Sequence, residues 1–166
     1  MISLTPVIKL LKPAPAGFAH PWFRQVAGAA EYARLRIEEL PLPAAWVVRA
    51  ADRVRHAGER LEDVDLAFDV VIAIENIRTH ADGETDDVLL AYRLAVKDLL
   101  LGWEVADESD PINFAGGQVI EYTDGDLYWR DRYVFSALIT NYLPDPLPAQ
   151  TDPGINRLEN SDEHYL

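Results

Sequence analysis

The acidic run DGETDD at residues 82–87 has the composition closest to a metal site in this chain of 166 residues. Carboxylates around a glycine turn are the ligands that Ca²⁺ takes in loop sites. The run lacks the spacing of such a loop and its closing glutamate. Helix capping explains it better, with Thr85 as the N-cap and Asp86 and Asp87 in the first turn, where carboxylates favour the helix dipole. We therefore expect no metal here.

The other reactive residue types do not form an enzyme-like pattern. The serines lack a nucleophile-elbow sequence, no histidine lies four residues from another, and Gly116-Gly117 is followed by a strand instead of a phosphate-binding loop. We expect no catalytic residues and no cofactor. A carboxylate pair for acid–base catalysis in a sheet–helix cleft stays open as an alternative, since 28 acidic residues also produce coincidental pairs.

An aromatic and basic cluster, Tyr128, Trp129, Arg130 and Arg132, could stack and neutralise single-stranded nucleic acid. The formal net charge of -13 argues against this use, because affinity for phosphate backbones comes mainly from Lys and Arg. The chain has no cysteine, which excludes disulfides and thiolate chemistry. The sequence contains no run of about 18 apolar residues, so we expect no membrane span. The acidic composition therefore favours other proteins or cations as partners.

Length and composition, 49% hydrophobic and 26% charged, predict one domain at residues 1–140. The proline-rich residues 141–166 predict an extended C-terminal tail. Thr5 as an N-cap and Pro6 at the first helical position predict a short helix that runs to about Lys12. Periodicity and breakers predict the following larger elements: helices at 28–40 and 85–101, strands near 44–49, 64–75, 117–123 and 127–139, and a loop or hairpin tip at 52–62. The fold class is α+β: a mainly antiparallel β-sheet of about four strands, covered on one face by two helices.

The strand at 64–75 shows the clearest alternation, with apolar residues at every even position. Its length exceeds the usual 3–10 residues, so we expect one end to project past the domain body. Asp124-Gly125 predicts a type I′ hairpin that sets Tyr122 opposite Leu127 and Ile120 opposite Trp129.

In this hairpin register Glu121 lies opposite Tyr128 on a polar face, while Ile120 and Trp129 belong to the apolar face. Asp131 interrupts the apolar face, which indicates a bulge or a buried acceptor with a partner.

The predicted helix at 85–101 has two apolar stripes, although one apolar face suffices to cover a sheet. The first stripe includes Tyr92 and Val96. The second contains Leu90, Leu94 and Leu101, on the far side of the helix. It must meet the chain's own N-terminal helix or tail, or a neighbouring subunit, and we take these leucines as candidate interface residues.

Several segments resemble one known family. They are LTPVIKLL, WFRQVAGAAEYARL, PAAWVVRAADR, FDVVIAIENI, LLLGWEVA and FAGGQVIEYTDGDLYWRDRY. Together they are similar to the tail terminator proteins of tailed bacteriophages and prophages, often described as Gp37-like. The resemblance covers about residues 3–139, and the glycine pair with the following D-G-x-L-x-W-x-D hairpin is its most specific part.

The resemblance implies a structural virion protein and no enzyme. Such proteins form a ring, typically hexameric, on the head-proximal end of the tail tube, stop its polymerisation and provide the surface that the head or neck joins. The implied partners are other copies of the chain, the tail tube protein, a neck or head-completion protein, and the sheath if the tail is contractile, with DNA only as passing cargo. Assembly would take place in the cytoplasm of the bacterial host. A neck or head–tail connector protein, or another minor tail protein, is the nearest alternative.

The matching residues read as architectural. We expect Gly116, Gly117, Asp124 and Gly125 to shape the hairpin, and Trp103 and Trp129 to pack the sheet against the helix. Contacts with a neighbour or the neck are expected from the tail, including its end residues Asn141, Tyr142, Tyr165 and Leu166.

Overall fold

A computed structural model describes residues 2–32, 41–58, 61–75, 84–122 and 125–140. Its sheet has the order β1-β2-β3-β5-β4, in which β1 is parallel to β2 and all other neighbours are antiparallel. The strands are β1 Gln25–Gly28, β2 Ala44–Ala57, β3 Leu61–Glu75, β4 Asn113–Tyr122 and β5 Asp126–Thr140; the helices are α1 Thr5–Leu11, α2 Ala29–Tyr32 and α3 Glu84–Leu100. The predicted α+β class is confirmed. The sheet has five strands where about four were expected, because the short parallel strand β1 adds one edge.

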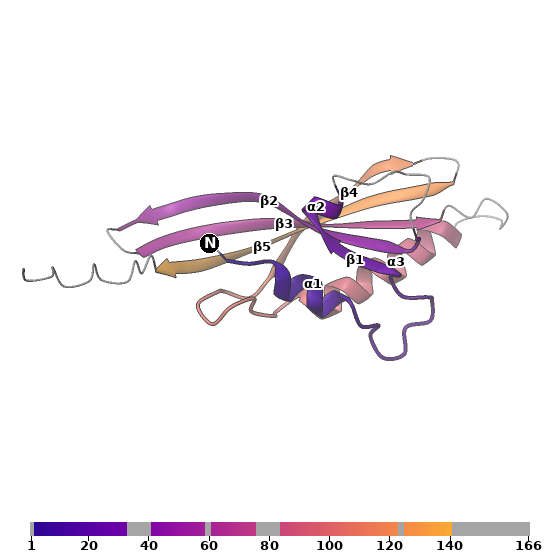
Figure 1. Ribbon diagram of the computed structural model, residues 1–166, viewed down its shortest axis with the longest axis horizontal. Coiled ribbons are helices and arrows are strands. Elements are labelled where there is room, and N and C mark those ends of the chain that lie inside the picture. The colour runs from indigo at the N-terminus through magenta and orange to yellow at the C-terminus, as the bar shows by residue number, and fades with distance from the viewer. Residues whose placement is uncertain (1, 33–40, 59–60, 76–83, 123–124, 141–166) are drawn as a thin grey trace, which may run out of the picture.

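Helices α1 and α3 lie on the same side of the sheet (Figure 1). Val7 and Leu11 of α1, with Tyr92 and Val96 of α3, pack on the even-numbered side chains of β3. The predicted core face of β3 is thus confirmed. Of the two helices expected on this face, the one at 85–101 is confirmed as α3, and α1 packs beside it. The expected helix at 28–40 is described only over α2, Ala29–Tyr32, because residues 33–40 lie outside the described residues.

Residues 52–62 were expected as a loop or a hairpin tip. The loop is wrong, because β2 continues to Ala57 and β3 begins at Leu61, whereas the junction of these antiparallel strands after Gly58 agrees with the hairpin tip. Residues 51–57 are exposed, so no buried face imposes an apolar alternation on them. Charged side chains pair across the two strands here instead of apolar ones: Arg55 contacts Asp63 at 2.6 Å and Asp65 at 3.1 Å. Residues 51–57, 61–63 and 138–140 form an arm that projects past α1 (Figure 1), as expected from the length of β3.

The register of the β4–β5 hairpin agrees with the prediction near its turn and then departs from it. Tyr122 pairs with Leu127 and Glu121 with Tyr128 as expected, but Val119, not Ile120, lies opposite Trp129. A register shift between Val119 and Glu121 leaves Ile120 out of the pairing and 42% exposed. An edge strand accommodates such a bulge because no further strand must match it. The turn type rests on Asp124, which lies outside the described residues.

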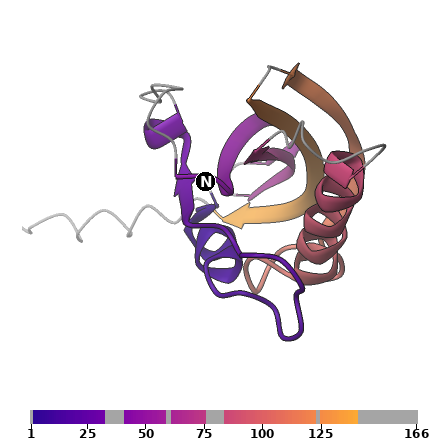
Figure 2. The ribbon, with the colours of Figure 1, turned by 90° about the vertical axis from the view of Figure 1, so that its right-hand side faces the viewer.

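The second face of the sheet has its own small apolar cluster. Tyr128, expected on a polar face, is 6% exposed and packs with Trp46 and Val71 on the side away from α3. Figure 2, which views the sheet from its end, shows how strongly the strands twist and curve. The polar-face prediction failed for Tyr128 because both faces of this part of the sheet contain buried side chains.

The helix ends differ by about one residue from the predicted ones. Thr85 lies inside α3, which begins at Glu84, so it is not the N-cap. Thr5 is the first residue of α1 and Leu4 is its N-cap. Gly102 lies two residues after the end of α3 and has φ +79, the left-handed conformation in which a glycine commonly ends a helix. No helix among the described residues is long and apolar enough to cross a membrane.

Candidate assembly surfaces

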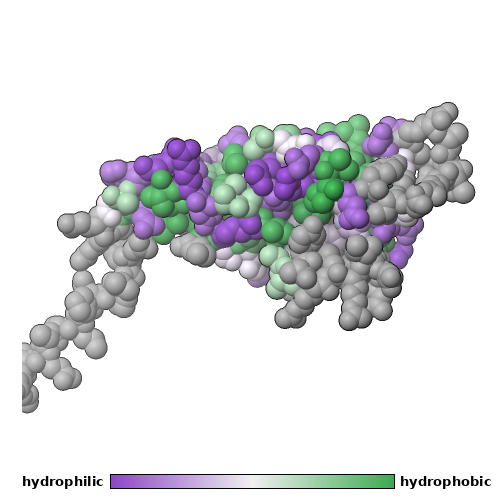
Figure 3. All heavy atoms as spheres, turned by 90° about the horizontal axis from the view of Figure 1, so that it is seen from above, coloured by the Kyte–Doolittle hydropathy of each residue, from purple (hydrophilic) through white to green (hydrophobic). Residues whose placement is uncertain are grey.

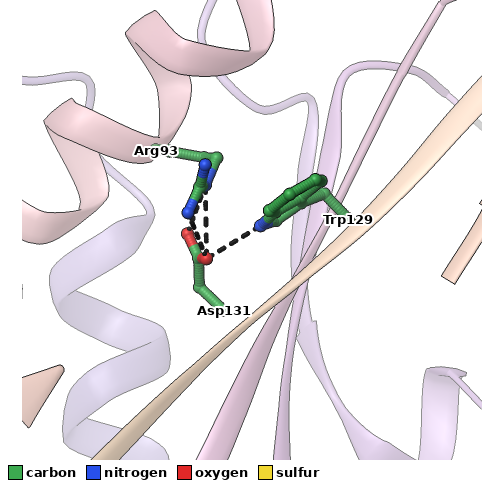
Figure 4. Close-up of polar contacts among 3 residues, drawn as sticks. All are labelled: Arg93, Trp129 and Asp131. Carbon is green, nitrogen blue, oxygen red and sulfur yellow. Dashed lines mark hydrogen bonds and ion pairs between the residues drawn. The ribbon is translucent and has the colours of Figure 1, made fainter. Parts of the chain in front are cut away.

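Asp131 is the centre of a buried polar junction between α3 and the β4–β5 hairpin. Its carboxylate is fully buried and accepts hydrogen bonds from Arg93 Nε at 2.9 Å and Arg93 Nη2 at 2.9 Å. It also accepts one from Trp129 Nε1 at 2.8 Å (Figure 4). The Arg93 guanidinium lies 4.2 Å from the centre of the Trp129 ring. The prediction of a buried acceptor with a partner is confirmed, and the junction ties the helix to the sheet.

Gly117 makes room for this junction. It lies opposite Asp131 on β4, and a Cβ at Gly117 would lie 2.1 Å from Asp131 Oδ1 and 3.0 Å from Arg93 Nη2. Such distances are below van der Waals contact, so only glycine fits there without a shift. Gly116 has φ +128, a backbone conformation that favours glycine, at the first register shift of β4. Both glycines thus lie where a side chain would be strained or obstructed, and their role in shaping the hairpin stays a prediction.

Trp103 and Trp129 are both partly buried and pack against the main core. Their role in packing the sheet against the helix stays a prediction. Gly125 lies beside the hairpin turn, while Asp124 lies outside the described residues. The same holds for the four tail residues Asn141, Tyr142, Tyr165 and Leu166, so the structure does not bear on their predicted contacts.

The second stripe of α3 faces outward. Leu90, Leu94 and Leu101 are 49%, 51% and 44% exposed, whereas Leu89, Tyr92, Val96 and Leu100 on the inner side are buried. Residues 15–20 approach Leu94 and form with α3 an open groove of about 420 Å³. Within the described part of the chain, the N-terminal segment thus borders the stripe but does not cover it.

The sheet face opposite α3 contains a charged cluster that sequence reasoning missed. Arg132 donates hydrogen bonds to both carboxylate oxygens of Asp69, at 2.7 and 2.9 Å, and Arg130 Nη1 lies 3.8 Å from the same carboxylate. Beside them Ser136 donates to Asp65 at 2.9 Å. The partners are more than 60 residues apart in the sequence, so only the β3–β5 register brings them together.

The two arginines border a polar hollow next to the glycine pair. We define the arginine groove by its lining residues Ala115, Gly116, Gly117, Gln118, Arg130 and Arg132, which enclose about 290 Å³. Figure 3 views the molecule from the side away from α1 and α3, where hydrophilic residues are interspersed with smaller hydrophobic areas.

The stacking platform considered for nucleic acid is contradicted. Tyr128 is buried, and the indole of Trp129 points to the α3 side, where Asp131 binds its N–H. Arg130 and Arg132 lie on the opposite face with Asp69. Alternation along β5 therefore separates Trp129 from the two arginines, and burial removes Tyr128 from the surface that they share.

The described residues offer little acid–base chemistry. Burial raises the pKa of Tyr92 to about 12, and its hydroxyl donates a hydrogen bond to the Pro21 carbonyl. Burial and the nearby Asp131 also raise the pKa of Tyr133. Neither phenol exchanges a proton near neutral pH. Among the described residues no group of three His, Asp or Glu side chains could hold a metal ion.

A comparison with protein families matches residues 3–142 to the family described as phage tail terminator protein. The match spans α1 through β5 and includes the glycine pair and the Asp131 junction. A comparison with curated proteins found no match.

Proposed function

This chain belongs to the phage tail terminator protein family, and from that premise we propose that it forms a closed ring capping the head-proximal end of the tail tube. The family is structural and not enzymatic, and places the protein in the virion tail, where an interaction with the tail tube is implied. The ring, with six copies as its expected number, stops polymerisation of the tube. Its free side is the surface that the neck or head joins.

The outward leucines of α3 are the observation that supports this proposal. Leu90 and Leu94 on α3 and Leu101 directly after it are half-exposed on the same side of the helix, whereas a single exposed leucine would need no explanation. A ring requires a heterologous contact, in which one surface meets a different surface of the next copy and the rotation closes. The leucine stripe of Leu90, Leu94 and Leu101 supplies one of the two surfaces.

The chain divides into two parts with different tasks in this proposal. Residues 1–140 are the α+β domain that builds the ring, and residues 141–166 are an extension that contacts a neighbouring copy or the neck. Asn141 and Tyr142 begin these contacts, and Tyr165 and Leu166 end them.

The substitution Leu94→Glu tests the ring. A charge in the centre of an apolar interface opposes association, while Leu94 contributes little to the core because it is 51% exposed. We expect the native mass, measured by light scattering at matched concentration, to fall from the ring to the protomer. The melting temperature of the protomer should stay unchanged, and Leu94→Met, which keeps an apolar side chain, should still assemble. A Leu94→Glu protein that stays fully assembled would show that the stripe lies outside the interface.

A neck or head–tail connector protein is the second candidate, because such proteins also assemble on the tail axis. Adding the tail tube protein of the same virus separates the two. A terminator binds tube ends and arrests growth of the tube, which electron microscopy of tube lengths would record. A connector leaves tube growth unchanged.

A further inference from the structure

We propose that the arginine groove binds carboxylates from the C-terminal segment, residues 141–166, of a second copy of this chain. This inference rests on the proposed ring and names a second contact between its subunits. It concerns the sheet face opposite α3, away from the leucine stripe.

The groove has an excess of positive charge. Two guanidinium groups share the single carboxylate of Asp69, whose side chain is 9% exposed. Arg132 takes both of its oxygens, so Arg130, at 3.8 Å, is beyond hydrogen-bond distance. The side chains of Arg130 and Arg132 are 33% and 42% exposed. A further carboxylate can therefore reach both guanidiniums without displacing Asp69.

The groove is open because of the residues opposite the arginines. Gly116 pairs with Arg132 and has no side chain, and a Cβ there would meet nothing within 4 Å. Strand β4 is the edge of the sheet, so no described strand lies on its outer side. Anionic groups can thus approach along the edge of β4.

The C-terminal segment has the complementary charge. Residues 141–166 contain five acidic residues and one arginine, Arg157; the acidic residues are Asp145, Asp152, Glu159, Asp162 and Glu163. Three of them lie within residues 159–163. Arginine recognises carboxylates through paired, charge-assisted hydrogen bonds. In a chain with a net charge of -13, a local excess of cations lowers the repulsion that an acidic segment would otherwise meet.

The position of Thr140 favours a neighbouring copy as the source of this segment. Strand β5 ends at the tip of the arm, far from the hairpin turn that joins β4 to β5 (Figure 1). Arg132 lies eight residues earlier, or about 26 Å back along the strand. The following 26 residues span at most about 90 Å. At Thr140 strand β5 points away from its own groove, so a neighbouring copy beside the arm tip can receive the following residues without a reversal of the chain.

Engineered cysteines in the full-length chain test the contact directly, since the natural sequence has none. Gln118→Cys places a thiol in the groove and Glu163→Cys places one in the segment. Under mild oxidation we expect a ladder of disulfide-linked oligomers on a non-reducing gel. The control pair joins Glu163→Cys with Val54→Cys, an arm residue that is 53% exposed. Equal cross-linking of both pairs would overturn the proposal, and a fast-migrating monomer would assign the groove to the segment of the same copy.

Native mass measured on the same samples separates this inference from the proposed ring. An assembled ring without the groove cross-link overturns the groove contact and leaves the ring intact. A groove cross-link between copies without a closed ring supports the contact and contradicts the ring. If neither the assembled ring nor the groove cross-link is observed, both proposals are contradicted.

A charge exchange gives an independent test. Arg130→Glu removes the loosely paired arginine and leaves Arg132 on Asp69, so the new carboxylate beside Asp69 should lower the melting temperature only slightly. We expect the concentration for half-assembly to rise roughly tenfold, as for the loss of one charge-assisted hydrogen bond. Adding Asp162→Lys and Glu163→Lys to the Arg130→Glu chain should restore assembly. Adding the same two lysines to a chain with Arg53→Glu, an exposed arm position that serves as the control, should not restore it. Failure of the restoration, together with binding of duplex DNA that Arg130→Glu abolishes, would assign the groove to phosphate instead.

Discussion

Gly117 and Asp131 lie directly opposite each other on β4 and β5, and the Asp131 carboxylate occupies the space where a Gly117 side chain would be. The fully buried carboxylate can then bind both Arg93 on α3 and Trp129 on its own strand. One missing side chain thus permits the connection between the helix with the leucine stripe and the hairpin beside the arginine groove. Orientation of the two proposed contact surfaces depends on this pair.

The substitution Gly117→Ala should destabilise the fold by about 3 kcal/mol, at the upper end of the cost of overpacking. The new methyl group would lie 2.1 Å from Asp131 Oδ1 and would push the carboxylate off Arg93. Chemical denaturation measures the change in free energy of unfolding. Gly58→Ala is the matched control, because its Cβ would meet only the Leu61 carbonyl oxygen at 3.4 Å. Equal stability of the two variants would show that the space at Gly117 is not needed.

Arg93→Met should cost about 3–5 kcal/mol, since it leaves the Asp131 charge buried without its ionic partner. Lys97→Met is the comparison on the same helix; its ammonium lies 3.7 Å from the centre of the Phe114 ring, and its loss should cost about 1 kcal/mol at most. The double variant Arg93→Met with Asp131→Leu should recover part of the loss, because it removes the unpaired charge as well. Urea denaturation of the two single variants and the double variant gives the coupling energy between Arg93 and Asp131. If Arg93→Met and Lys97→Met lowered the free energy of unfolding by similar amounts, the buried pair of Arg93 and Asp131 would have no special role.

Asp126→Asn should stabilise the protein at pH 7 by about 0.2–1 kcal/mol. Partial burial, followed by the nearby Glu75 and Glu121, raises the pKa of Asp126. The folded state therefore holds this proton more tightly than the unfolded state does. The stabilising effect of that proton is complete below the ordinary pKa of an aspartate and is lost as pH rises through the raised pKa. Thermal unfolding at pH 7 and pH 3 should show the gain at pH 7 only; the same gain at both values would exclude the electrostatic explanation.

A chain truncated after Thr140 should fold with an unchanged melting temperature and assemble poorly. The described core lies within residues 2–140, whereas the proposed second contact requires the residues that follow. Circular dichroism measures folding and light scattering measures assembly. Undiminished assembly would show that the ring closes through the domain alone.

The local pattern was sufficient for the elements that have one buried face. The even-numbered residues of β3 and the inner stripe of α3 were identified correctly, and so was the outward position of Leu94. Asp131 could be recognised as a buried acceptor because it interrupts an apolar series. Its partner Arg93 could not be named, since 38 residues and a helix–sheet contact separate the two.

The arm and the arginine groove had no comparable signal. Residues 52–57 looked like a loop because exposed strands have no apolar alternation. The bulge at Ile120 displaced the expected pairing by one residue and altered which side chains share a face.

The sequence by itself determined the α+β class, the direction of each side chain along β3 and α3, and the family, because these follow from local periodicity and from the succession of residues. Only the tertiary structure decided which side chains meet. The partners of Asp131 and Asp69 are set by strand register, helix placement and bulges, all of which depend on packing between segments far apart in the chain.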